Sequence, residues 1–209
     1  MAVSYPADIA KSVRIETLLA SGGGAAGGAG TGTRPGQAAK QTPVAPAYIA
    51  GDTGPAGGIV FYDKGNSSGG RRYLEAASRD AGSGSWANGY DVDGTKVEIG
   101  SGKQNTQLII NYMMEAGNSP GGADVQAIPA GGYSDWFLPS KAELNLMYWN
   151  LKQQELGDSG NGKYWSSSDN TDDGLWVSAW AQRFSDGYQE GSMVHNKGNA
   201  YSVRAVRQF

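Results

Sequence analysis

The chain contains no cysteine and only one histidine, His195. Without cysteine it can form no disulfide, no cysteine-ligated zinc site and no thiol nucleophile. No hydrophobic run reaches the roughly 18 residues that a membrane-spanning helix needs. Seventeen basic and twenty acidic residues give a net charge of −3, so the chain lacks the basic surface that nucleic-acid binding requires. We therefore expect neither membrane insertion nor a nucleic-acid partner.

Glycine is abundant, at 33 of 209 residues, and it is accompanied by six tryptophans and eleven tyrosines. The glycine content is about twice the usual share of roughly 7%. A disordered glycine-rich chain would lack the large aromatic residues. The composition therefore predicts a folded domain with short elements and many loops.

The chain divides into three parts. Residues 1–20 resemble a short helix after Pro6, and Asp8 and Lys11 interrupt any apolar run of the kind found in a signal peptide. This segment is either a frayed tail or a docking helix that folds against a partner. Residues 21–47 are rich in Gly, Ala, Thr and Pro and indicate a flexible linker. The folded domain is expected to span residues 48–209.

The folded part is organised around residues 131–155. The stretch 131–139, Gly-Gly-Tyr-Ser-Asp-Trp-Phe-Leu-Pro, is typical of an aromatic loop. Ser140 and Glu143 have the spacing of a capping box, which predicts a helix over residues 141–155 with Gly157 as its stop. The apolar stripe of this helix consists of Leu144, Met147, Tyr148 and Leu151.

A second helix is predicted to begin at the cap Asn105 and to end at Gly117. Trp86 is expected to be a buried anchor within a long polar loop. Arg204 and Arg207 lie in the last predicted strand and should pair with carboxylates, because naked charges are rarely buried. The stripe of the second helix comprises Ile109, Tyr112, Met113 and Ala116, and strands are predicted at 58–62, 72–76, 164–168, 176–180, 181–184 and 201–209.

Few residues offer catalytic or metal-binding chemistry. His195 lies in a polar loop, and no nucleophile-elbow pattern accompanies it. The run Asp91-Val92-Asp93-Gly94 resembles the start of a calcium loop but lacks its closing glutamate, so an ordinary turn is the better interpretation. The oxygens of Asp169, Asn170, Asp172 and Asp173 could form a weak cation site, although solvated turn residues are favoured. We expect no catalytic residue, no cofactor and no metal ligand.

Four ordered motifs resemble one protein family over about residues 51–209. They are the stretch 131–148, Tyr164-Trp165-Ser166-Ser167-Ser168, Ala179-Trp180 and Val203-Arg204-Ala205-Val206-Arg207. The family comprises the variable proteins of diversity-generating retroelements and the C-terminal domains of Lcl-type collagen-like adhesins. The resemblance implies an α+β fold of the C-type lectin type, with two short helices and small mixed or antiparallel sheets.

The resemblance implies ligand binding rather than enzyme activity. It divides the last third of the chain into framework residues, which hold the fold, and display residues, which meet a ligand. The implied framework comprises Tyr164, Trp165, Ser166, Ala179, Trp180, Phe184, Gly187, Val203, Arg204, Val206 and Arg207. The implied display residues combine aromatic and arginine anchors with small polar residues, as antibody paratopes do. They are Trp176, Ser178, Arg183, Ser185, Asp186, Tyr188, Glu190, Ser192, Met193, His195, Asn196, Asn199 and Tyr201.

Two functions fit this interpretation. The first is a receptor-binding protein of a phage or virus, placed in the virion tail by its N-terminal segment, which recognises a host-cell surface protein or glycan. A homotrimer is a candidate assembly for such a protein. The second is a cell-surface adhesin that binds a polysaccharide or glycosaminoglycan. Sugar binding through calcium is not expected, because neither Glu-Pro-Asn nor Gln-Pro-Asp occurs in the chain.

Overall fold

The structure is a computed structural model and describes residues 47–209 apart from 88–89, 119–131, 171–177 and 192–196. The predicted N-terminal helix and nearly all of the predicted linker lie outside the described residues. Tyr48–Phe209 forms one compact unit of α+β type. Its helices are α1 (Gly102–Glu115) and α2 (Lys141–Asn150), with 3-10 turns η2 (Ser68–Gly70) and η6 (Lys152–Gln154). Its strands are β1 (Ile59–Asp63), β2 (Tyr73–Ala76), β3 (Gly82–Gly84), β4 (Lys163–Asp169), β5 (Ala179–Arg183), β6 (Gln189–Glu190), β7 (Tyr201–Val203) and β8 (Val206–Gln208).

Helix α2 begins at the predicted capping box. The Ser140 side chain accepts a hydrogen bond from the Glu143 amide, and the Glu143 carboxylate accepts one from the Ser140 amide. The predicted apolar stripe is confirmed, because Leu144, Met147, Tyr148 and Leu151 are all buried. The helix ends at Asn150 rather than at residue 155, because the chain tightens into η6 and Glu155 then adopts a left-handed conformation with φ 55°.

Helix α1 begins earlier than predicted. Its N-cap is Ser101, and Asn105 lies one turn inside the helix, where its buried side chain bonds the backbone N–H and C=O of Lys96. Its first residue, Gly102, packs closely against the cap of α2, since a Cβ there would overlap the Glu143 carboxylate. Ile109 and Met113 are buried as predicted, whereas Tyr112 is exposed and Ala116 is the exposed C-cap.

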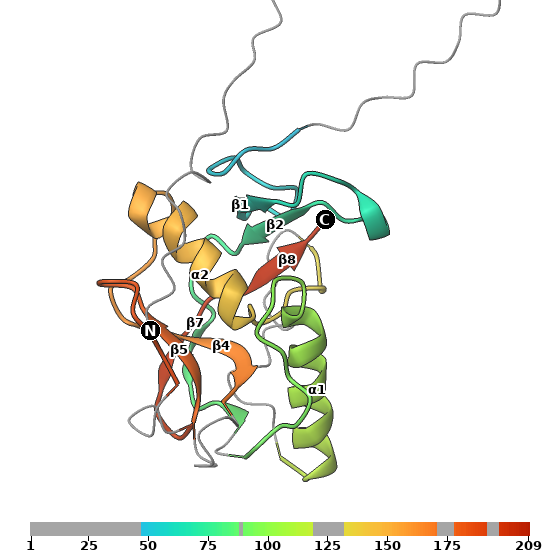
Figure 1. The fold of residues 1–209 in the computed structure, drawn as a ribbon, viewed down its shortest axis with the longest axis vertical. Coiled ribbons are helices and arrows are strands. Elements are labelled where there is room, and N and C mark those ends of the chain that lie inside the picture. Colours follow the sequence, from blue (N-terminus) through green and yellow to red (C-terminus); the bar gives the residue numbers. More distant parts are fainter. Residues whose placement is uncertain (1–46, 88–89, 119–131, 171–177, 192–196) are drawn as a thin grey trace, which may run out of the picture. The chain divides into compact units, whose positions relative to one another are not determined.

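The strands form two small sheets (Figure 1). One has the antiparallel order β1-β2-β8, and the other has the order β3-β7-β4-β5-β6, in which β4 and β7 run parallel. The single strand predicted over 201–209 is wrong, because the chain changes sheet between β7 and β8. The break predicted between Trp180 and Ala181 is also wrong, since both belong to β5.

Arg204 anchors the segment in which the chain passes from one sheet to the other. It lies between β7 and β8, where its guanidinium pairs with Asp80 at 2.6 Å and donates to the carbonyl of Ala77. Arg207 on β8 pairs with Glu75 at 2.9 Å and with Asp135 at 2.6 Å. The predicted pairing of both arginines with carboxylates is therefore confirmed.

Two apolar cores share the interior, and neighbouring residues of β4 belong to different ones: Trp165 to the first and Tyr164 to the second. The first contains Trp86, Trp136 and Trp165 with the inner face of α1, and it confirms Trp86 as a buried anchor. The second contains Tyr148 and Phe184 with the inner faces of α2 and the three-stranded sheet. Helix α2 contacts β1 as well as β4 and β5. Within the described part of the chain, no helix is long and apolar enough to cross a membrane.

Candidate functional site

The register of two neighbouring strands places two cationic side chains next to each other. Lys163, the first residue of β4, lies opposite Arg183, the last residue of β5. Between these side chains lies Glu190 of β6, whose carboxylate is 3.6 Å from the Lys163 ammonium and 3.7 Å from the Arg183 guanidinium. Strand pairing therefore creates a charged centre at one end of the five-stranded sheet.

Two tyrosines flank this centre. The Tyr201 ring on β7 lies 5.4 Å from the Lys163 ammonium, and the Tyr188 ring lies 5.7 Å from the Arg183 guanidinium. Tyr188 is 58% exposed, as expected of a contact residue rather than a core residue. The contacts join six side chains into one surface, which we name the β4–β6 face: Lys163, Arg183, Asp186, Tyr188, Glu190 and Tyr201.

The charges of the β4–β6 face are paired with one another. Arg183 donates to both carboxylate oxygens of Asp186, and the closest approach is 2.5 Å. This pairing raises the pKa of Arg183 and lowers the pKa of Asp186 from its ordinary value. The two cations are thus balanced by the carboxylates of Asp186 and Glu190, and the face carries no net charge.

The turn that carries Tyr188 is held in place by hydrogen bonds and by close packing. Gln182 donates from its side-chain amide to the Asn145 side chain on α2 and to the carbonyl of Gly187. Gly187 has φ 78°, and a Cβ there would overlap the Tyr148 ring. Only glycine suits this position, because it combines a left-handed backbone with close packing. The turn therefore presents Asp186 and Tyr188 from a rigid base.

Tyr201 is also held in place. Its ring packs against the buried Trp165 ring, with centroids 4.3 Å apart, and its hydroxyl accepts a hydrogen bond from the Asn199 side chain. One side of Tyr201 is therefore part of the core, and the rest borders the face. Such half-buried aromatic residues lose little conformational entropy when they bind a ligand.

The predicted display residues have several outcomes. Arg183, Asp186, Tyr188, Glu190 and Tyr201 meet in the β4–β6 face, while the exposed Ser185 and the half-buried Asn199 lie beside it in the chain. The display role predicted for Ser178 is corrected, because this residue is fully buried and its hydroxyl donates to the carbonyl of Gly191 at 3.0 Å. Five predicted residues lie outside the described residues: Trp176, Ser192, Met193, His195 and Asn196.

The predicted framework residues are largely interior. Trp180 is half-buried, and the Lys141 ammonium lies 3.0 Å from its ring centroid. Gly187 is half-buried beneath the turn described above. The buried members are Tyr164, Trp165, Ser166, Ala179, Phe184, Val203, Arg204, Val206 and Arg207.

The sequence interpretation missed two lysines. Lys163 belongs to the β4–β6 face, and its place could have been found only from the pairing of β4 with β5. Lys197 is completely buried, with its ammonium 2.5 Å from Asp91 and 2.8 Å from Asp169. Nothing in the surrounding polar sequence distinguishes this lysine from a solvated one.

Lys197 changes the interpretation of the candidate cation site. Asp169 is bonded to the Lys197 ammonium and to the Val92 amide, so its oxygens already have partners. Burial raises the pKa of Asp169, and Lys197 opposes that shift. Asp172 and Asp173 lie outside the described residues. Within the described ranges, no group of three or more His, Asp or Glu side chains is arranged to hold a metal ion.

Comparison with protein families and with curated proteins finds no match. Among solved structures, the chain is similar to a fimbrial protein from Bacteroides ovatus ATCC 8483, with a TM-score of 0.46 and 14% sequence identity. The similarity covers 66% of this chain and 36% of the fimbrial protein. The chain thus corresponds to about a third of that protein's length.

Proposed function

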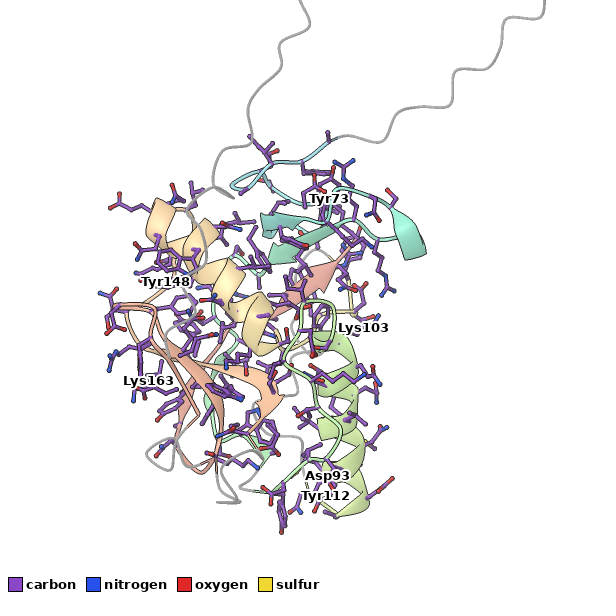
Figure 2. All side chains as sticks on the ribbon, viewed as in Figure 1. Tyr73, Asp93, Lys103, Tyr112, Tyr148 and Lys163 are labelled. Atoms are coloured by element: carbon purple, nitrogen blue, oxygen red, sulfur yellow. The ribbon has the colours of Figure 1, made fainter. Side chains whose placement is uncertain are left out.

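We propose that the protein is a ligand-binding protein that recognises a cell surface through the β4–β6 face. The observation that carries this proposal is the continuous set of contacts from Tyr201 through Lys163, Glu190 and Arg183 to Tyr188. Tyr and Arg are the residues that most often supply binding energy at interfaces. Figure 2 shows Lys163 on the strands and Tyr112 at the far end of α1, so the face can be tested against a separate exposed tyrosine.

The charge balance of the face favours one ligand class over another. A sulfated polymer such as a glycosaminoglycan would need cations that are not already engaged, because its binding depends on a positive field. Lys163 and Arg183 instead lie beside Glu190, and Arg183 is held by Asp186. We therefore favour a protein surface or an uncharged glycan as the ligand, and the adhesin that binds a polysaccharide remains the second candidate.

The proposed scaffold is of the C-type lectin type, and we propose that the protein is a variable protein of a diversity-generating retroelement. The motif order in the sequence supports this assignment, and an α+β unit with two helices and two small sheets is compatible with it. In this proposal the display residues are the diversified positions. Residues 1–47 would attach the binding unit to a phage or virus tail, with a homotrimer as a candidate assembly.

Binding should be measured with labelled protein on a panel of intact bacterial cells and on an array of immobilised glycans. Tyr188→Ala and Arg183→Ala should each weaken binding to any positive target by about 2 kcal/mol, which is roughly thirtyfold. Tyr112→Ala is the matched control, because it removes an exposed tyrosine from α1. Equal binding by all three variants would show that the β4–β6 face is not the site.

The coding DNA tests the retroelement assignment separately. Diversification predicts adenine-rich codons confined to about residues 176–201, a nearby near-copy of that segment, and a reverse-transcriptase gene. A gene without these features would leave a binding protein of fixed sequence and would favour the adhesin.

A further inference from the structure

Asn161 and Gly162 form an exposed pair immediately before the β4–β6 face. They lie in a bend directly ahead of Lys163, the first residue of β4. In an Asn-Gly pair the backbone nitrogen of the glycine can attack the asparagine side chain, because no glycine side chain blocks its approach. This chemistry requires a local backbone that is free to bend, which exposed loops provide more often than helices and strands.

The structure leaves both reacting groups accessible. No hydrogen bond between the described residues engages the Asn161 side-chain amide or the Gly162 N–H. A Cβ placed on Gly162 would have no heavy atom within 4 Å, so the space around the attacking nitrogen is open. Other described asparagines are held: Asn105 is buried and bonded to Lys96, and Asn150 in α2 donates to the carbonyl of Phe61 at 2.8 Å.

From this geometry we propose that Asn161 is a site of spontaneous deamidation that alters the β4–β6 face. The Gly162 nitrogen loses its proton to solvent base and attacks Cγ of Asn161, forming a C–N bond. The bond from Cγ to the side-chain nitrogen breaks, and ammonia leaves. The resulting five-membered succinimide is opened by water at one of its two carbonyls, which gives an aspartyl or an isoaspartyl residue at position 161.

The product changes the face in two ways. Either product places a new carboxylate two residues from Lys163, so a face whose charges now cancel becomes negative. The isoaspartyl product also adds a backbone carbon just before β4. That insertion strains the bond from the Phe184 amide to the Gly162 carbonyl, now 2.8 Å, which fixes the Lys163–Arg183 register. The effect on binding rests on the proposed function, whereas the chemical step does not.

Mass spectrometry of the aged full-length protein tests the step. Trypsin cleaves after Lys152 and Lys163, and peptide 153–163 contains Asn161 as its one asparagine. After incubation in warm, mildly alkaline buffer, we expect this peptide to gain the mass of amide-to-acid conversion and to split into two isomers. Conversion should be faster at higher pH, because the attacking nitrogen must lose its proton.

Gly162→Ala is the matched variant. It keeps Asn161, fits the open space, and places a methyl group beside the attacking nitrogen, so conversion should be several-fold slower. Peptide 142–152, which contains the helical Asn145 and Asn150, should remain unmodified. Peptide 80–96 contains the pair Asn88-Gly89, which lies outside the described residues, and checks that the conditions permit the reaction.

Two results would overturn the proposal. One is a peptide 153–163 that stays intact under conditions in which peptide 80–96 is converted, and the other is equal conversion in Gly162→Ala. Binding of Asn161→Asp in the cell and glycan assays measures the consequence for the face. Because modification is detected by mass, a failure of the binding proposal and a failure of the deamidation proposal are distinguishable.

Discussion

Replacing Lys197 with methionine removes a buried charge while keeping most of the side chain's length. The Lys197 ammonium is fully enclosed, between Asp91 and Asp169 and 4.9 Å from the centre of the Trp86 ring. The two carboxylates differ in environment, because the Asp169 side chain is 1% exposed and that of Asp91 is 34% exposed. Asp91 can therefore be solvated after the substitution, and Asp169 cannot.

The expected cost follows from the stranded Asp169 carboxylate. Removing one partner of a buried ion pair typically destabilises a protein by about 3–5 kcal/mol. For a domain of this size that corresponds to a decrease in Tm of about 6–20 °C. Lys103→Met is the control: Lys103 lies on α1 (Figure 2), and it forms no ion pair within the described residues. Its unfolding free energy should change by less than about 0.5 kcal/mol.

The pH dependence and a second substitution make the prediction specific. Burial raises the pKa of Asp169 and Lys197 opposes the shift, so Lys197→Met should raise that pKa further. Folding of the variant then takes up a proton between the two pKa values, and its deficit should shrink as the pH falls through the folded pKa toward the unfolded pKa. Asp169→Asn in the Lys197→Met background should recover much of the loss. Urea unfolding that shows strictly additive effects, or a deficit unchanged by acid, would refute the reasoning.

Four further outcomes are expected. Trp165→Ala should lower the unfolding free energy by about 3–5 kcal/mol, while Trp149→Ala, at a residue that is 54% exposed, should change it by less than about 0.5 kcal/mol; similar melts would remove Trp165 from the core. Gly187→Ala should cost more than about 1 kcal/mol, because its positive φ and the Tyr148 ring both exclude a methyl group, and an unchanged Tm would contradict this. The Arg72 hydrogen bond lowers the pKa of Asp63 from its ordinary value, so the stability it adds is present above the unfolded pKa and is lost as the pH falls through the folded pKa; Arg72→Gln should lower the Tm slightly at neutral pH and not at all in stronger acid, whereas a constant gap would rule out the linkage. Deleting residues 1–47 should leave the Tm of the remaining unit unchanged by calorimetry, and a deletion variant that fails to fold would place the domain boundary elsewhere.

Local patterns predicted the parts of the fold that local chemistry decides. The Ser140–Glu143 capping box and the stripe of α2 are confirmed because their hydrogen bonds and spacing involve neighbouring residues. The start of α1 was mispredicted because the sequence does not reveal that the Asn105 side chain bonds the backbone of Lys96 from within the helix. Asn105 resembles a cap in sequence, but the fold uses its side chain to hold Lys96 and places Gly102 against Glu143 instead.

The candidate site was predicted in composition but not in arrangement. Arg183 and Tyr188 were predicted as anchors from their residue types. Ser178 was predicted from its residue type as a small polar contact residue, but it is buried. The difference arises from position along β5: Ser178 precedes the strand within the interior, and Arg183 is the last residue, at the sheet's end. Residue type alone cannot distinguish the two positions.

The position of the β4–β6 face follows from the burial of the sheet to which it belongs. β4 lies in the middle of the five-stranded sheet, and every residue of β4 except Lys163 is buried. Of β4, therefore, only its first residue can meet a ligand. β5 runs antiparallel to β4, and β7 runs parallel to it. The last residue of β5 and the first residues of β4 and β7 therefore meet at the same end, which brings together Arg183, Lys163 and Tyr201. The short edge strand β6 adds Glu190 from the side, paired with Ala181. Strand direction thus brings Lys163 and Tyr201, which are 38 positions apart in the sequence, to the same end of the sheet.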